Sequence, residues 1–113
     1  MKKIIILDII ETPNAIINSY GNLIYNEIVS AFNENDKVVL SFKGLKNCNS
    51  AFLISCIGEL YRVFPSDEIK NRLLLEDIDN EIWLRRIDEI ILLATNPEER
   101  ERYAEVILNA LDY

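Results

Sequence analysis

Three short apolar runs, separated by longer segments with helical spacing, constrain most strongly how this chain can fold. The runs are residues 4–10, 37–42 and 72–75, and the first two are rich in β-branched side chains. Runs of this length that end at turn-forming residues are typical of buried strands. Strands that alternate with helices predict an α/β fold, here a small mostly parallel or mixed sheet of three to four strands packed with about four helices.

The segments between the runs predict the helices. Apolar residues recur every three or four positions over about residues 23–32, 50–64 and 80–95. A last helix is expected from residue 97, because Asn96 and Pro97 suit a helix start. A short second strand is expected at Ala15–Ile17.

Length and composition limit the function. The chain has 113 residues, half of them hydrophobic, which suits a single domain over 1–113. There is no histidine, which argues against the common nucleophilic triads and removes the commonest transition-metal ligand. Cys48 and Cys56 are too few for a zinc site or a disulfide scaffold. We therefore expect free thiols in the cytoplasm, no cofactor, no metal and no enzymatic activity.

The charge is uneven along the chain. The net charge is −7, and all of the acidic excess lies in residues 66–113, which carry 13 acidic and 6 basic side chains. Such a field repels a phosphate backbone and attracts a basic protein surface, so nucleic acid is not an expected partner. The apolar run after Lys2 and Lys3 is too short for a signal peptide or a membrane span, so membrane insertion is not expected.

Residues 38–60 carry the most informative motif. An apolar strand runs into Ser41–Leu45, a polar loop follows, and a helix begins at Ser50–Phe52. This segment resembles the STAS-like family, relatives of sulfate-transporter and anti-sigma-factor-antagonist domains. That family has a strand ending in Asp-Phe-x-Gly-Val, a short loop and a Ser/Thr-rich helix start. The matching residues are Val38, Val39, Leu40, Phe42, Gly44, Leu45, Ser50, Phe52, Gly58 and Leu60.

The resemblance implies a STAS-like fold and an interaction module that docks on a protein partner of the kind typical of the family, a kinase-like ATPase or a signalling protein. Two departures stand out. Ser41 replaces the family aspartate, and Ala51 stands where the antagonists have their phospho-acceptor serine. Alanine cannot be phosphorylated, so such regulation is lost here or has moved to Ser50.

The candidate docking region is the loop and helix start over residues 43–52. A serine at a helix N-terminus lies where a phosphate is tolerated, and nearby lysines could pair with that phosphate. The plainer alternatives stay open: Ser50 or Asn49 only caps the helix, the lysines are only solvated, and Phe52 belongs to the core. The candidate site residues are Lys43, Lys46, Asn49, Ser50 and Phe52.

Two other functions are considered. The C-terminal helices could pair with a second copy in a self-associating structural protein, which would be a homodimer. Less expected is an enzyme that holds Mg²⁺ with Asp77, Asp79 and Glu81 after the third strand. The favoured prediction is a non-enzymatic interaction module of bacterial signalling in the cytoplasm.

Overall fold

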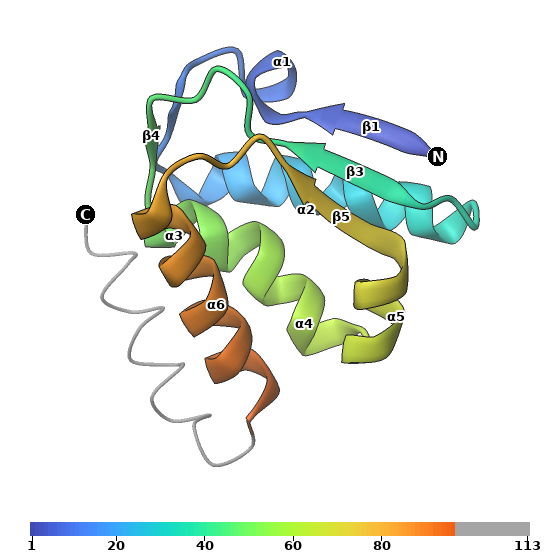
Figure 1. Cartoon of the computed structure of the whole chain (residues 1–113). Coiled ribbons are helices and arrows are strands. Elements are labelled where there is room, and N and C mark those ends of the chain that lie inside the picture. Colours follow the sequence, from blue (N-terminus) through green and yellow to red (C-terminus); the bar gives the residue numbers. More distant parts are fainter. Residues whose placement is uncertain (97–113) are drawn as a thin grey trace.

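The computed structural model describes residues 1–96, which form an α/β fold (Figure 1). Its main sheet has three parallel strands in the order β1-β3-β5, and a second sheet pairs β2 with β4. The predicted fold class is confirmed, whereas the helix predicted from residue 97 lies outside the described residues. The strands are β1 (Lys2–Ile5), β2 (Asn14–Ala15), β3 (Val38–Ser41), β4 (Asn47–Cys48) and β5 (Leu73–Glu76). The helices are α1 (Ile6–Ile10), α2 (Asn18–Asn33), α3 (Ser50–Leu53), the π-helical turn η1 (Ile54–Gly58), α4 (Glu59–Val63), α5 (Ser66–Arg72) and α6 (Glu81–Thr95).

β3 is the centre of the main sheet, and all four of its residues are buried. Leu40 lies between Ile4 of β1 and Leu75 of β5. A strand that is paired on both edges and buried along its whole length needs a continuous apolar sequence, which explains the Val-Val-Leu run. The strands predicted at 37–42 and 72–75 are therefore confirmed to within about two residues.

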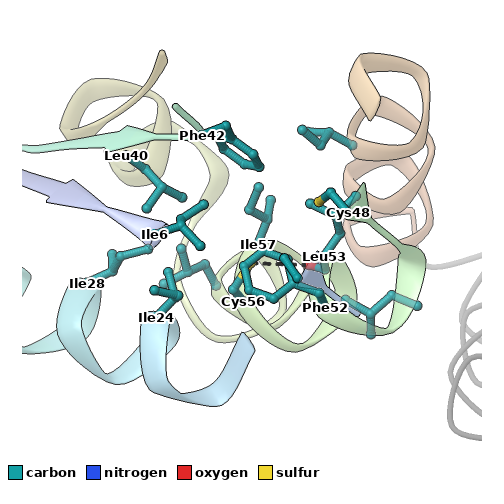
Figure 2. Close-up of a cluster of buried hydrophobic side chains, with 14 of the residues drawn as sticks. Ile6, Ile24, Ile28, Leu40, Phe42, Cys48, Phe52, Leu53, Cys56 and Ile57 are labelled. Carbon is teal, nitrogen blue, oxygen red and sulfur yellow. Dashed lines mark hydrogen bonds between the residues drawn. The ribbon is translucent and has the colours of Figure 1, made fainter. Parts of the chain in front are cut away.

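Helices α2, α3 and α4 lie below the main sheet, and α6 packs against α3, η1 and α4, whereas α1 lies beyond the end of β1 (Figure 1). α2 crosses from β1 to β3, and α3, η1 and α4 form one continuous rod between β3 and β5. Figure 2 shows their apolar side chains meeting the sheet in one core. At Gly21 the backbone of α2 comes so close to this rod that an added Cβ would lie 2.5 Å from the Phe52 carbonyl oxygen. Glycine at this position is therefore a packing requirement.

The prediction of one strand over residues 4–10 is wrong in its second half. β1 ends at Ile5, and residues 6–10 form the short helix α1. Ile6 and Ile10, four residues apart, are both buried, while Asp8 between them is exposed. Glu11 ends the helix with a left-handed φ of 60°. A helical turn buries two isoleucines on one side, and this burial outweighs the strand preference of β-branched residues.

Arg72 fixes the other end of the sheet. Its guanidinium donates to the carbonyl oxygens of Phe32 (2.6 Å) and Asp36 (3.0 Å), and it lies 4.4 Å from the centre of the Phe32 ring. These bonds tie the end of α2, and the turn before β3, to the start of β5. The remaining loops, at the carboxyl ends of the strands, carry the candidate site.

Candidate functional site

The loop after β3 begins with a tight turn. The Leu45 N–H donates to the Phe42 carbonyl oxygen at 3.2 Å, and Gly44 has a φ of 84°. A turn with positive φ at its third position needs glycine, because a side chain there would be strained. The turn leaves Lys43 exposed at its corner.

The rest of the loop is fastened to the segment before α2. β4 pairs in parallel with β2. The N–H groups of Lys46 and Asn47 both donate to the Pro13 carbonyl oxygen, at 2.8 and 3.2 Å. The Asn47 side-chain amide donates to Asn14 Oδ1 at 2.6 Å. The sequence predicted a polar loop here, and the structure holds that loop in place through backbone hydrogen bonds.

Asn49 is the cap of the helix that follows. Its Oδ1 accepts from the Phe52 N–H at 3.1 Å, and its Nδ2 donates to the Ile16 carbonyl oxygen at 2.9 Å. Ser50, the other predicted cap, is already the first residue of α3. Asn49 has the role because its backbone is extended, as a cap requires, with φ −110° and ψ 177°. Its side chain therefore links the loop to the start of α3 and to the segment before α2.

The other predicted site residues are placed very differently. Lys43 and Lys46 are exposed, and Ser50 is half-buried. The Ser50 hydroxyl makes no hydrogen bond with residues 1–96, so it is not committed to a cap. Phe52 is 0 % exposed and belongs to the core, as the plainer alternative predicted. It cannot anchor a partner.

Ala51, at the place of the antagonists' phospho-acceptor, is also buried, with 4 % exposure. The Ala51 side chain therefore packs in the core, and it has no hydroxyl that could be phosphorylated. Ser50 is thus the accessible hydroxyl at this helix start.

Sequence reasoning missed two exposed residues beside the loop. Ile16 and Ile17 are each 42 % exposed, and the backbone of Ile16 is bonded to Asn49. An apolar pair shortly after Pro13-Asn14 was the available signal, but it was interpreted as part of a short second strand. We define the loop surface as five exposed or half-exposed residues of these two joined segments: Ile16, Ile17, Lys46, Asn47 and Ser50.

A buried serine joins this loop to the one after β5. Ser41 is 0 % exposed, and its hydroxyl donates to Asp77 Oδ2 at 2.5 Å. The Ser41 Oγ in turn accepts from the Lys43 N–H at 3.3 Å. The STAS-like pattern has an aspartate at the end of this strand. In this chain Ser41 stands there instead, and the carboxylate comes from Asp77 in the loop after β5. The two loops are therefore held at a fixed spacing.

Between the two loops lies a cleft of about 440 Å³ at the carboxyl ends of β3 and β5. Ligands of parallel α/β sheets commonly bind at this edge. Within residues 1–96 no three His, Cys, Asp or Glu side chains gather closely enough to hold a metal ion. The acidic stretch Asp77, Asp79 and Glu81 thus does not form the metal site considered above. The cleft is lined by Phe42, Lys43, Gly44, Leu45, Asp77, Ile78, Asp79 and Trp83.

Both cysteines are free and buried. Burial raises the pKa of Cys48 to about 12, although the nearby Arg86 guanidinium opposes this rise. Burial raises the pKa of Cys56 further still. Thiols held in the neutral form are poor nucleophiles and poor metal ligands, so neither cysteine contributes chemistry to the site.

The comparison with protein families identifies the fold. The model of the STAS-like domain of unknown function (DUF4325) matches residues 20–83, which is more than half of the chain. The chain therefore belongs to this family of STAS-like domains, as its strand-loop-helix motif predicted. No curated protein and no solved structure matches it. No helix in residues 1–96 has the length and apolar character that a membrane span requires.

Proposed function

We propose that this chain is a non-enzymatic interaction module of bacterial signalling, and that it docks on a partner protein through the loop surface. The supporting observation is that this loop is exposed and is also held to residues 13–16, by its backbone and by the Asn49 side chain. A surface already in its binding shape loses little conformational entropy on association.

The composition of the loop surface suits a protein partner. Ile16 and Ile17 provide apolar contact area, and Lys46 and Asn47 provide polar groups around them. An apolar centre with a polar rim is the usual anatomy of a protein interface. In the anti-sigma-factor antagonists that the sequence resembles, the partner is a kinase-like ATPase or another signalling protein. We propose a partner of this class in the cytoplasm, with no nucleic acid, cofactor or metal taking part.

Site-specific photo-crosslinking in the native cell tests the proposal. A photoreactive amino acid at Ile17 or Lys46 should give the same discrete crosslinked protein. The matched control is Glu34, which is also exposed but lies just after α2, at the opposite end of the sheet. Equal crosslinking from Glu34, or none from Ile17 and Lys46, would contradict the proposal.

Ser50→Asp tests whether negative charge regulates this surface. Aspartate is favoured near helix starts, so the melting temperature should stay nearly unchanged. The yield of the Lys46 crosslink should fall, because the charge alters what can dock there. An unchanged yield would remove Ser50 from the docking surface.

A second candidate function is self-association through the C-terminal helices. Leu84 and Leu92 lie two turns apart on α6 and are 43 % and 58 % exposed. Apolar side chains left in solvent on one helix favour contact with another apolar surface. Light scattering decides between the candidates, since a monomer at all concentrations excludes this one.

A further inference from the structure

We infer that the cleft between the β3 and β5 loops receives an arginine side chain of the partner protein. This inference rests on the proposed function, because the arginine belongs to the docked partner. The lining of the cleft runs along the β3 loop as far as Leu45, and the next residue, Lys46, belongs to the loop surface, so a partner on that surface could reach both.

The apolar part of the cleft fits the body of such a side chain. Leu45, Ile78 and Trp83 line it together with Phe42. An arginine has a long methylene stem and a flat, weakly hydrated guanidinium that stacks on aromatic rings. A lysine ammonium is compact and strongly hydrated, so it would contact the apolar and aromatic lining residues less favourably.

The charges in the cleft favour a cation. Asp77 and Asp79 both line it and are exposed, and neither makes an ion pair with another residue in 1–96. Lys43 is the single basic residue of the lining, which leaves a formal charge of −1. Residues 66–96 carry 8 acidic and 4 basic side chains, and this excess adds a longer-range attraction for a basic surface.

The arrangement argues against an anion in the same place. The start of α6 lies at the cleft, but the Asn80 side chain already accepts from the N–H groups of Ile82 and Trp83. An anion would therefore lose the backbone donors that usually attract it to a helix start. Asp77 is held by Ser41, so one carboxylate is fixed in advance for a guanidinium.

The test uses the whole chain and two short peptides. Trp83 is the only tryptophan in the chain, so its indole N–H gives one NMR signal that reports on the cleft. N-acetyl-Gly-Arg-Gly-amide should shift this signal with an affinity on the order of millimolar. The citrulline peptide, which has the same shape without the charge, should bind at least about tenfold more weakly.

Three variants assign the binding to this cleft. Asp79→Asn should weaken the arginine peptide about threefold, and Lys43→Gln should strengthen it about twofold. Asp67→Asn is the matched control, because Asp67 is also exposed but belongs to the first turn of α5, away from the cleft. That control should leave the affinity unchanged.

Equal binding of the two peptides, or no effect of Asp79→Asn, would overturn the inference. Crosslinking from Lys46 without arginine binding would leave the proposed function intact and remove only the arginine. Arginine binding without crosslinking would contradict the docking proposal and leave no partner to supply the side chain, which overturns the inference as well. Dimerisation that Asp79→Asn abolishes would overturn it in favour of a second copy.

Discussion

Asn49 shows how one side chain can serve a binding surface without touching a partner. Its two polar atoms are both used inside the chain, one on α3 and one on Ile16. Both segments of the loop surface therefore depend on this residue. A loss of docking in an Asn49 variant would report a displaced loop.

Asn49→Ala should lower the free energy of unfolding by about 2 kcal/mol, since a cap and a further hydrogen bond are each worth about 1 kcal/mol. Asn49→Asp keeps the cap but loses the donor to Ile16, so it should lose about half as much. Urea unfolding measures both values. Asn26→Ala, an exposed change within α2, is the control and should stay within about 0.5 kcal/mol. Equal values for Asn49→Ala and Asn26→Ala would refute the dual role.

At the scale of elements, the contact between α2 and the α3–η1 rod decides how closely the helices approach. Gly21 lies at this contact. An added methyl group would lie 2.5 Å from the Phe52 carbonyl oxygen and 2.6 Å from the Ser55 Cβ. One of these neighbours is backbone, so it cannot move aside without shifting a helix.

Gly21→Ala should therefore destabilise the protein by about 2 kcal/mol, although alanine is the better helix former by about 1 kcal/mol. The steric clash outweighs the helical preference. Thermal and urea unfolding of the variant measure whether its free energy of unfolding falls or rises relative to the parent. Asn22→Ala, one residue along and exposed, should be neutral or slightly stabilising. A more stable Gly21→Ala protein would show that the helices can separate freely.

The sequence was informative where local patterns and tertiary packing agree. The apolar residues of β3, β5 and α6 follow a single pattern, and turn or cap residues mark the ends. These three elements were therefore predictable. α1 was not predictable, because isoleucine favours strands. The segment is helical because that conformation buries Ile6 and Ile10 on the same side, which depends on tertiary packing. The β2–β4 pairing was also hidden, because two short segments 33 residues apart meet without any matching pattern. The same cause hid Ile16 and Ile17.

For the whole molecule, the buried thiols couple stability to alkaline pH. The folded pKa of Cys48, about 12, lies above its ordinary value of 9.0. The unfolded chain therefore loses its thiol proton first, and stability falls as pH rises above about 9. The expected slope is up to about 1.4 kcal/mol per pH unit for each thiol.

Cys48→Ala should make the fall of stability with pH less steep, by up to about 1.4 kcal/mol per pH unit, because one buried thiol is removed. Urea unfolding at about pH 8, 9 and 10 measures it. Burial also raises the pKa values of Tyr25 and Tyr61, but the dependence that they add near pH 10 is common to the variant and the parent and cancels in the comparison. The variant and the parent should differ by a constant amount below about pH 8. Parallel curves up to pH 10 would mean that Cys48 ionises in the folded protein.

The parallel sheet has a consequence for how the molecule acquires its shape. Lys2 pairs with Val38, and Val38 pairs with Leu73, which are separations of 36 and 35 residues. No hairpin can start this sheet, so long loops must close before its first inter-strand bond forms. A nascent chain that has not yet released β5 and the start of α6 from the ribosome lacks Asp77, Ile78, Asp79 and Trp83, and therefore has no cleft.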